Sequence, residues 1–554
     1  MVEINAGDTA WVLVSAALVM LMTPAVGFFY GGLVRRKNVL AIMGQSFIIL
    51  SIISIQWVLI GYSLVFGHSI GGIIGDLSFL GLNGVGGEPN EAYVPTIPQY
   101  AFVAFQMMFA IITPALIIGA FADRMKFIAF IAFILLWTTL VYDPVAHWVW
   151  GAGGWLKNMG ALDFAGGTVV HITAGLSALA AALIIGKRLG YDTEKMIPHN
   201  IPFTLLGGAI LWFGWFGFNA GSAFSSGALA STAFIVTNTA AAAAAIAWII
   251  ASKTSGIKPS LSGIVIGSVA GLVAITPASG FVSPLSAIII GLAAGVASFY
   301  AIQLRGKTPI DDSLDVFACH GVGGILGSIA VGIFAEKTIN EAGANGLLFG
   351  NASLLGVQVL AVLATGAYAF IATTLILFFL KFFIGLRVSK KEELEGLDAA
   401  YYGEEAYDFI SGREPMALHV LSGVKVVDVM NAKVRTASPE DTLSKVQEMM
   451  FEKQHFAFPV LENELLAGVV TISDLKKIST SERARVKVSA VFTRSPKVAY
   501  PDETIHELVE RMQVEHVSNM PVVDRNEQTK LLGIISKSDI IKAYKRIALE
   551  NIGR

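Results

Sequence analysis

Residues 163–171 read Asp-Phe-Ala-Gly-Gly-Thr-Val-Val-His and open an apolar run that continues to residue 186. About 20 apolar residues are enough for a helix to cross the hydrocarbon core of a bilayer. The stretch therefore predicts a transmembrane helix with an acid, Asp163, at its start and a histidine, His171, eight residues later. The same step from aspartate to histidine occurs again from Asp312 to His320.

Apolar runs fill the chain as far as residue 385. Of its 554 residues, 54% are hydrophobic and 14% are charged, against roughly 25% charged in soluble proteins. Eleven runs are long enough to span a membrane, approximately 10–33, 40–66, 99–121, 127–146, 165–186, 201–220, 228–251, 261–279, 284–304, 313–334 and 352–384. The sequence predicts an all-α polytopic membrane domain of eleven helices over residues 1–385, followed by a cytoplasmic tail over residues 386–419.

The loops between these runs alternate in lysine and arginine content. One set contains Arg35, Arg36, Lys37, Arg124, Lys126, Lys187, Arg188, Lys195, Lys253, Lys258, Arg305 and Lys307. The opposite set contains only Lys157 and Lys337. Basic loops stay in the cytoplasm, so we expect the N-terminus outside, the C-terminal region inside, and residence in the cell (inner) membrane. The first run follows Glu3 and Asp8 rather than basic residues, which favours a retained span over a cleaved signal peptide.

The two aspartate–histidine elements run in opposite directions in this topology. Asp163 opens the fifth span at the outer face, and Asp312 opens the tenth at the inner face. A second echo joins residues 27–32, Gly-Phe-Phe-Tyr-Gly-Gly, to residues 217–222, Gly-Phe-Asn-Ala-Gly-Ser. Spans one to five and six to ten are therefore predicted to form an inverted repeat, with the eleventh outside it. Such repeats are typical of transporters.

The two histidines are the first candidates for function. Eight helical residues rise about 12 Å, which would bring His171 and His320 close to the middle of the membrane. A single buried histidine is explained as readily by a hydrogen bond to a neighbouring helix. Two at equivalent depths favour a shared pathway, and neutral imidazoles can relay a proton without carrying a permanent charge.

Candidate residues also gather at the outer ends of the helices. Asp163 precedes Gly166 and Gly167, where it can cap a helix and also attract a cation. The aromatic and hydroxyl candidates are Phe105, Phe109, Trp150, Trp215, Phe218 and Ser222. Aromatic side chains at this depth usually form the interfacial belt. They can instead bind a small cation through their ring faces, with Ser222 accepting a hydrogen bond, and the sequence leaves both interpretations open.

Several function classes are disfavoured. The net charge of −2 gives no indication of nucleic-acid binding, and the single cysteine, Cys319, excludes an intrachain disulfide framework. The sequence has no Walker-type loop, metal-ligand cluster or nucleophile–base arrangement. We therefore expect neither an enzyme nor a metal protein, and no cofactor for transport.

Five strings of the first 410 residues match motifs of one known family: residues 29–35, 105–110, 163–171, 218–222 and 315–321. On these strings, residues 1–410 resemble the Amt/Mep/Rh ammonium transporter family, on its bacterial and archaeal Amt side. The resemblance implies a homotrimer with one pore per subunit and ammonium or ammonia as the solute. It also implies roles: Phe105, Trp150 and Ser222 in outer recruitment; Phe109 and Phe218 as a stacked block; Trp215 in the pore wall; His171 and His320 as twin pore histidines; and Asp163 as a structural and deprotonation-linked acid.

This resemblance leads to a mechanism in which NH₄⁺ is captured outside and loses a proton. NH₃ and H⁺ then cross separately, and the solute is reprotonated inside. Residues 386–410 resemble the regulatory tail of the family, which in relatives meets the signalling protein PII. Tyr402 stands where a histidine is expected before Gly403-Glu404, which puts PII binding in doubt.

A direct repeat occupies the rest of the chain. Residues 439–442 match 501–504, residues 458–460 match 520–522, and residues 468–474 match 533–539. Each copy reads as a helix, two strands and a second helix, and about 60 residues make a small core, so the two copies should pack together. They resemble an α/β tandem CBS pair, or Bateman module, with CBS 1 over residues 420–480 and CBS 2 over 481–554.

The CBS resemblance implies an adenine nucleotide (AMP, ADP or ATP) as regulatory ligand. Its phosphate and ribose would be held by Thr471, Asp474, Ser536 and Asp539. Backbone N–H groups at a helix start favour phosphate binding, although the same side chains also serve as simple helix caps. Two functions therefore remain open: an ammonium transporter regulated by nucleotide, and an ammonium sensor that signals through the CBS pair with little net flux. Twin histidines in an apolar pore favour transport.

Overall fold

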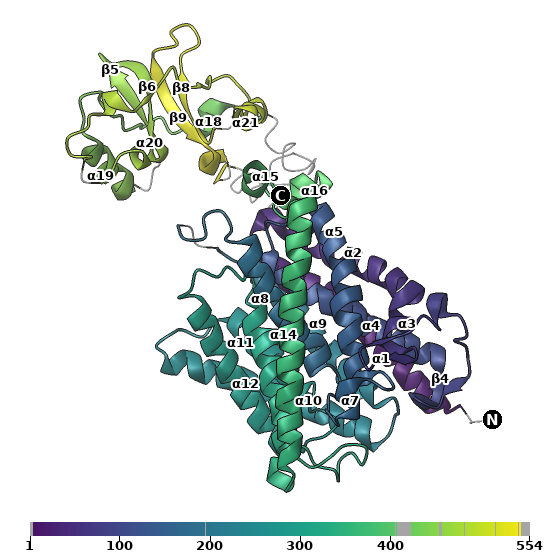
Figure 1. The fold of residues 1–554 in the computed structure, drawn as a ribbon. Coiled ribbons are helices and arrows are strands. Elements are labelled where there is room, and N and C mark those ends of the chain that lie inside the picture. Colours follow the sequence, from purple (N-terminus) through teal and green to yellow (C-terminus); the bar gives the residue numbers. More distant parts are fainter. Residues whose placement is uncertain are drawn as a thin grey trace, which may run out of the picture. The chain divides into compact units, whose positions relative to one another are not determined.

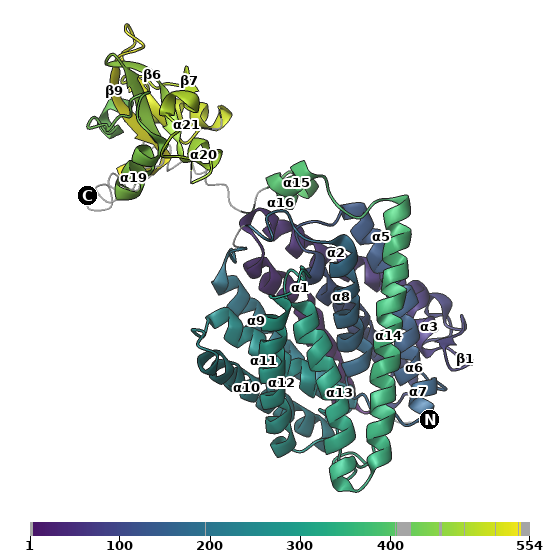
Figure 2. The same cartoon turned by 60° about the vertical axis from the view of Figure 1, so that its left-hand side comes forward.

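The long apolar runs form long helices that lie beside one another in the first of two units (Figures 1 and 2). The computed structural model describes residues 4–193, 196–404, 406, 423–453, 457–480, 482–515, 517–540 and 542–543. The first unit covers Met1–Ala406 and the second Tyr407–Arg554. Lys195 of the basic loops, most of the predicted tail beyond Ala406, and the first residues of predicted CBS 1 lie outside the described residues.

Ten helical stretches of the described chain are long and apolar enough to cross a membrane. They are Ala6–Leu33, Arg36–Phe66, Gln99–Phe121, Phe127–Asn158, Gly167–Ile185, Ile201–Ala223, Ala228–Thr254, Pro284–Arg305, Phe317–Phe334 and Ala352–Phe383. The other predicted span, 261–279, contains α11 (Leu261–Ile275), which has only 15 residues. Ten spans are thus confirmed by length and composition, and the eleventh remains a prediction.

Short breaks divide several of these stretches into labelled elements. In chain order the helices are α1 (Ala6–Leu33), η1 (Arg36–Asn38), α2 (Val39–Gln56), η2 (Trp57–Gly61), α3 (Tyr62–Phe66), η3 (Leu80–Leu82), α4 (Gln99–Ile117), η4 (Ile118–Phe121), α5 (Phe127–Trp137), η5 (Thr138–Tyr142), α6 (Asp143–Trp150), α7 (Trp155–Asn158), η6 (Gly167–Ile172), α8 (Thr173–Ile185), α9 (Ile201–Ala220), η7 (Gly221–Ala223), α10 (Ala228–Thr254), α11, α12 (Pro284–Arg305), η8 (Phe317–Gly321), α13 (Val322–Phe334), η9 (Leu347–Phe349) and α14 (Ala352–Phe383). Four of the breaks, η2, η5, η6 and η8, are π-helical turns.

The sequence explains where several helices begin. A side-chain oxygen accepts from a backbone N–H of the first turn at α1, α9, α11, α12 and α14, which satisfies a donor that the helix itself cannot pair. The capping residues are Asn5, Asn200, Ser260, Ser283 and Asn351. Small two-stranded sheets, β1 (Ser69–Ile70) with β2 (Ile74–Gly75) and β3 (Pro89–Asn90) with β4 (Val94–Pro98), occupy the loop between α3 and α4.

Both the interior and much of the outer surface of the helical unit are apolar. On α14, Leu363 and Leu375 are each 64% exposed and Phe382 is 83% exposed. A soluble surface would not keep a stripe of this kind, whereas lipid tails solvate it without cost. The exposed stripe therefore fits a helix that faces a bilayer.

Buried ion pairs tie together the loops at one end of the unit. Arg188 makes a fork-shaped pair with Asp311, with Nη2–Oδ1 2.8 Å and Nε–Oδ2 2.9 Å. Burial raises the pKa of Asp311, but hydrogen bonds from Arg188 and the charge of Arg124 outweigh it and hold that pKa below its usual value. Arg124 also donates to the carbonyls of Ala120 and Asp311. These arginines come from the predicted cytoplasmic loops.

The start of the predicted tail packs onto the same loops. It forms α15 (Lys390–Glu395) and α16 (Leu397–Tyr402). The carboxylate of Asp398 accepts from the backbone N–H of Ala41 at 2.7 Å, in the first turn of α2, and the hydroxyl of Tyr401 donates to the carbonyl of Met125. The described part of the tail is therefore built into the helical unit.

The second unit contains two mixed α/β halves. The first has α19 (Leu443–Lys453), β5 (Ala457–Glu462), β6 (Leu465–Thr471) and α20 (Ile472–Lys476); the second has α21 (Ile505–Val514), β8 (Asn519–Val523) and β9 (Leu531–Ser536). β5 and β6 pair antiparallel, as do β8 and β9. Three described elements were not expected from the repeat: the short helix α18 (Val426–Val429), β7 (Thr493–Arg494), which pairs with β6, and η10 (Val488–Ala490).

The two halves exchange segments at their ends. Val426, on the short helix α18 (Val426–Val429), packs in one cluster with Ile505, Met520 and Ile535 of the second half. Asn431 also exchanges two backbone hydrogen bonds with Ile534. The physical reason is the small size of each core, which gains apolar cover from the neighbouring copy.

Candidate functional site

The two predicted histidines lie together in the interior of the helical unit. Nδ1 of His171 and Nδ1 of His320 are 3.3 Å apart, and the two ring centroids are 5.3 Å apart. The side chains are buried, with 1% and 4% of their surface exposed. In two neutral rings one Nδ1 donates and the other accepts, so the rings take opposite tautomers. Nε2 of His171 is also buried and has no hydrogen-bond partner among the described residues.

Glycines allow the two histidine-bearing helices to approach this closely. A Cβ built on Gly175 would lie 2.2 Å from the backbone nitrogen of Gly321, and one on Gly324 would lie 3.0 Å from Cβ of His171. Each histidine sits in a π-helical turn, η6 or η8. Turns of this kind insert a residue into the α-helical ladder and occur frequently at functional sites.

The helices begin later than the sequence predicted. η6 starts at Gly167, and η8 starts at Phe317, so several residues between each aspartate and its histidine are not helical. The helical rise of about 12 Å between them was therefore too large. Gly166 adopts φ 111°, a conformation that glycine tolerates, as the chain turns into η6.

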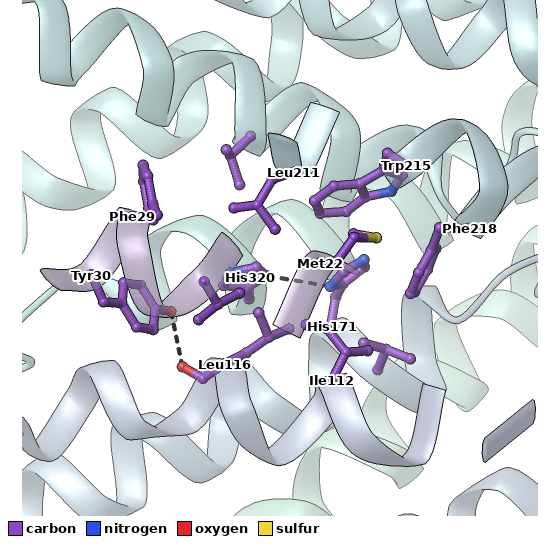
Figure 3. Close-up of a pocket in the computed structure, with 13 residues that line it drawn as sticks. Met22, Phe29, Tyr30, Ile112, Leu116, His171, Leu211, Trp215, Phe218 and His320 are labelled. Carbon is purple, nitrogen blue, oxygen red and sulfur yellow. Dashed lines mark hydrogen bonds between the residues drawn. The ribbon is translucent and has the colours of Figure 1, made fainter. Parts of the chain in front are cut away.

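A narrow, mostly apolar cavity adjoins the histidine pair; we call it the inner cavity (Figure 3). The space open to the centre of a water-sized molecule is about 10 Å³, close to the minimum that one water molecule needs. Its lining comprises Met22, Val26, Phe29, Tyr30, Ile112, Leu116, Val170, His171, Leu211, Trp215, Phe218, Val269 and His320. Besides the imidazoles, its polar groups are few: the Tyr30 hydroxyl donates to the Leu116 carbonyl, and Trp215 Nε1 donates to Thr276 Oγ1.

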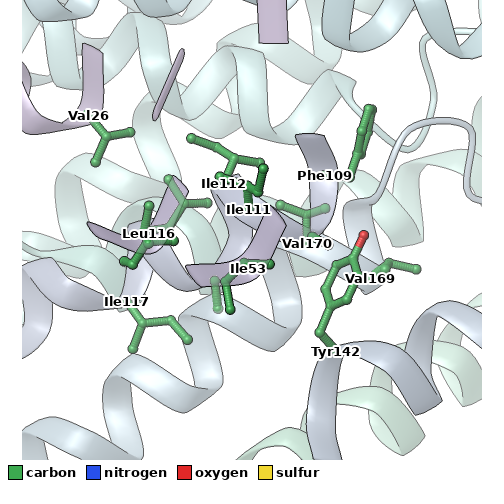
Figure 4. Close-up of a cluster of buried hydrophobic side chains, with 14 of the residues drawn as sticks. Val26, Ile53, Phe109, Ile111, Ile112, Leu116, Ile117, Tyr142, Val169 and Val170 are labelled. Carbon is green, nitrogen blue, oxygen red and sulfur yellow. The ribbon is translucent and has the colours of Figure 1, made fainter. Parts of the chain in front are cut away.

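Packed aliphatic and aromatic side chains surround this region (Figure 4). Val26 of α1, Ile112 and Leu116 of α4, and Val170 of η6 belong to one buried cluster and also line the inner cavity. Walls of this kind offer no partners to an ion that leaves its hydration shell. The cavity therefore suits a small neutral molecule.

A stacked pair of phenylalanines stands at one side of the histidines. The rings of Phe109 and Phe218 are 4.2 Å apart at 26°, and each side chain is 1% exposed. Trp215 lies against His171 with ring centroids 5.5 Å apart. Phe218 lines the inner cavity, whereas Phe109 lines a second pocket. The pair therefore separates the two spaces.

The second pocket, which we call the outer pocket, has about 170 Å³ open to water-sized molecules. It is lined by Phe66, Ala92, Tyr93, Phe102, Gln106, Phe109, Val149, Trp150, Lys157, Phe164, Ser222 and Phe224. Trp150 Nε1 donates to the carbonyl of Asp163, and Ser222 Oγ donates to the carbonyl of Phe218, which leaves the Oγ lone pairs available.

Not every predicted residue lines a cavity. Phe105 is fully buried and supports the ring of Phe109 from behind, at 4.9 Å between centroids, but it lines neither space. Gln106, Tyr30 and Lys157 line the cavities and were not singled out from the sequence. Gln106 and Tyr30 lie inside the strings that carry the family resemblance, and this position could have marked them as candidates for the cavity lining.

Asp163 lines neither cavity, and its carboxylate caps the start of η6. Its carboxylate accepts from the backbone N–H groups of Gly166, Gly167 and Thr168 at 2.7–2.8 Å and from the Thr168 hydroxyl. The side chain is buried, with 8% of the residue exposed. Its capping contacts agree with the sequence-based expectation, and a role in attracting cations stays a prediction.

In the second unit the predicted ligand residues form two capping boxes: Asp474 accepts from the backbone N–H of Thr471, and Asp539 from that of Ser536, each at 3.0 Å. Thr471 Oγ1 donates to Asp474 Oδ2 at 2.8 Å, and Ser536 Oγ donates to Asp539 Oδ2 at 2.5 Å. Lys477 also pairs with Asp474 at 2.9 Å. Burial raises the pKa of Asp474, but the hydrogen bonds from Lys477 and Thr471 outweigh it, and the pKa falls below its usual value. These contacts show caps in both halves.

Comparison with known proteins assigns the family. The profile of the Ammonium Transporter Family matches residues 10–407. The chain belongs to the ammonium transporter family. An ammonium transporter of Bacillus subtilis is 50% identical over 404 residues, covering 72% of this chain and 98% of the relative, and the ammonium transporter Amt1 of Archaeoglobus fulgidus is 51% identical over 401 residues, covering 72% and 99%.

Solved structures agree with this assignment. Mep2 of Saccharomyces cerevisiae matches with a TM-score of 0.67 and 37% identity, over 70% of this chain and 90% of that one. A structure described as a sensor Amt protein matches with a TM-score of 0.66 and 34% identity, over 72% and 98%. The profile of the CBS domain matches residues 426–481 and 488–546. This ammonium transporter family member is therefore a multi-pass membrane protein with a C-terminal CBS pair, and not an enzyme.

Proposed function

We propose that this protein transports ammonium by separating it into ammonia and a proton. The outer pocket recruits NH₄⁺, the ion loses a proton near Phe109 and Phe218, NH₃ passes the inner cavity, and the proton moves separately. The observation that carries the proposal is the pair of mutually bonded, buried imidazoles beside an apolar space with room for about one water-sized molecule.

Proton loss supplies the selectivity in this mechanism. Ammonium and potassium have similar size and equal charge, so a binding site alone discriminates poorly between them. Moving an ion into an apolar environment is very costly, and only ammonium can avoid that cost, because potassium has no proton to give. The neutral imidazoles of His171 and His320 accept and donate hydrogen bonds along the way without adding a permanent charge.

Each predicted site residue has a place in this proposal. Trp150 and Ser222 offer a ring face and an oxygen to NH₄⁺ in the outer pocket, and Phe105 supports that site through its contact with Phe109. Phe109 and Phe218 block the passage of hydrated ions. Trp215 forms the wall beside His171, and Asp163 fixes the start of η6 and is linked to deprotonation.

The arrangement in the membrane is also part of the proposal. We infer eleven spans with an inverted repeat of five plus five, the N-terminus outside, the CBS pair in the cytoplasm and residence in the cell (inner) membrane. We propose a homotrimer, as the family resemblance implies, with apolar faces in contact with lipid. Tyr402 in place of the expected histidine argues against binding of a PII-type protein. The proposed domain boundaries are 1–385, 386–419, 420–480 and 481–554.

We propose that the CBS pair binds AMP, ADP or ATP and thereby regulates transport. Thr471, Asp474, Ser536 and Asp539 stand at helix starts, and the N-terminus of a helix favours phosphate binding. Support comes from the family match and from these capping boxes. A full-length protein that gives no calorimetric signal with any of the three nucleotides, or an unchanged signal in Asp539→Ala, would count against this regulation.

Transport can be tested on purified protein in liposomes. A step of ammonium concentration should evoke a current in the wild type that His171→Ala removes or strongly alters. His68→Ala is a matched control, because His68 lies on a predicted outer loop and 81% of its side chain is exposed. An ammonium current that survives unchanged in His171→Ala would contradict the mechanism.

A sensor is the second candidate, favoured by the CBS pair and by the likeness to the sensor Amt protein. In that case ammonium would alter nucleotide affinity at the CBS pair while turnover stayed negligible. Measuring ammonium uptake and nucleotide binding on the same preparation separates the two functions: high uptake supports transport, and altered nucleotide binding without uptake supports sensing.

A further inference from the structure

The outer pocket contains a cation that belongs to the chain itself. Lys157 lies on α7 and lines the pocket together with Trp150 and Ser222. Its Nζ donates to the backbone carbonyl of Trp150 at 3.0 Å. The same Nζ lies 5.6 Å from the centroid of the Tyr93 ring, within the range of a cation–π contact.

These partners are the ones that a free ammonium ion would use. A lysine side chain ends in an ammonium group, with N–H donors and one positive charge. Trp150 is the last residue of α6, so its carbonyl has no acceptor role within that helix and is bound by Lys157 instead. Lys157 therefore occupies an acceptor and a ring face that a recruited ion would bind, and its charge repels that ion from the rest of the pocket.

We propose that Lys157 is a tethered ammonium group that lowers the affinity of the outer pocket for free ammonium. This inference rests on the proposed function, since it concerns the same pocket. It makes Lys157 an affinity-determining residue that acts on the half-saturating concentration and leaves the maximal rate, which depends on the histidines, largely intact.

The remaining acceptors of the pocket support this division. Ser222 Oγ keeps free lone pairs, and Oε1 of Gln106 is buried without a hydrogen-bond partner in the described chain, with the residue 6% exposed. A recruited cation can bind these two oxygens while Lys157 holds the carbonyl of Trp150. Ser222 and Gln106 both line the outer pocket, so their oxygens are assigned to the recruited ion and the carbonyl of Trp150 to Lys157.

The expected effect follows from electrostatics. A unit charge within the same small pocket, partly screened by solvent, changes the affinity for a monovalent cation by about three- to thirtyfold. Neutralising Lys157 should lower the half-saturating ammonium concentration by that factor. The repulsion between the Lys157 charge and the ammonium ion is removed, and the carbonyl of Trp150 becomes available as a further acceptor.

The test measures ammonium-evoked currents of the full-length protein in liposomes over a range of concentrations. Lys157→Met and Lys157→Gln remove the charge, and Lys157→Arg keeps it. Lys337→Met is the matched control, because Lys337 is the other lysine of the predicted outer loops, is exposed, and lies in neither cavity lining. We expect a lower half-saturation in Lys157→Met and Lys157→Gln, and a value near the wild type in Lys157→Arg and Lys337→Met.

Two results would overturn the inference: an unchanged or raised half-saturation in both neutral variants, or an equal decrease in Lys337→Met, which would trace the effect to general surface charge. A purely structural role would reduce the maximal current and leave the half-saturation unchanged. A histidine-dependent wild-type current combined with an unaffected Lys157→Met refutes this inference alone. A wild type without such a current removes the proposed function and this inference together.

Discussion

The contact between the two histidine-bearing helices gives the sharpest test of the pathway. A Cβ on Gly175 would lie 2.2 Å from the nitrogen and 2.3 Å from Cα of Gly321. Both are backbone atoms and cannot rotate away. Carbon atoms in ordinary contact stay about 3.5 Å apart, so Gly175→Ala should push the helices apart by about 1 Å.

That displacement acts directly on the imidazole pair. The Nδ1–Nδ1 distance of 3.3 Å between His171 and His320 would grow to about 4 Å, beyond hydrogen-bond reach. Overpacking of this kind costs about 1–3 kcal/mol of stability, which most folded proteins tolerate. We therefore expect Gly175→Ala to be produced and folded but to lose most of its ammonium-evoked current.

The assay is the liposome current, with thermal unfolding in detergent as a check on folding. Gly356→Ala is the matched control, because Gly356 lies in the membrane helix α14 and a Cβ there would meet nothing within 4 Å. A folded Gly175→Ala protein with wild-type current would refute the reasoning, since it would show that the imidazole contact is not needed.

Three other substitutions test the buried polar groups by thermal unfolding. Asp163→Ala should cost at least about 3 kcal/mol of stability, because three buried N–H groups lose their acceptor. Asp163→Asn keeps one side-chain oxygen and should lose less stability. Equal losses in the two variants would argue against the capping role. Gln56→Leu should cost about 1–3 kcal/mol of stability, because Gln56 Nε2 donates to buried Asp143 at 2.8 Å. Adding Asp143→Leu should restore part of the lost stability. A double variant no more stable than Gln56→Leu would contradict the pairing. Arg188→Met should cost about 3–5 kcal/mol at neutral pH by leaving Asp311 unpaired. The wild-type pKa of Asp311 is lowered, so the ion pair contributes fully to the free energy of unfolding above the usual carboxyl pKa and loses this contribution as pH falls through the lowered value. The difference in free energy of unfolding between the wild type and Arg188→Met should therefore narrow in acid. A difference that does not change with pH would refute the ion pair as its cause.

The coarse architecture could be read from the chain because it depends on local composition. Ten of the predicted spans appear as long apolar helices, and the direct repeat correctly located two similar α/β halves. The remaining predicted span, 261–279, is not confirmed in the same way, because its helix, Leu261–Ile275, is short. Hydropathy measures the length of an apolar run, but helical hydrogen bonding decides how much of it is helix.

The candidate site was predicted residue by residue but not in its geometry. The matching strings pointed to His171, His320, Phe109 and Phe218, and the structure brings these four together. Phe105 was expected in the recruitment site; its ring contacts Phe109 and is not part of the lining of the outer pocket, so its role in recruitment stays a prediction. Its sequence position near the helix end gave no indication of which way the ring would point.

The sequence by itself determined which segments are apolar, which residues repeat, and where acids, histidines and capping side chains stand along the chain, because these are properties of near neighbours. Only the tertiary structure decided that two imidazoles meet at 3.3 Å, that Lys157 enters the outer pocket, and that Val426 joins the core of the distant second half. Such contacts join residues far apart in sequence. They depend on how closely backbones can approach, which is set by the packing of whole helices and strands rather than by any local pattern.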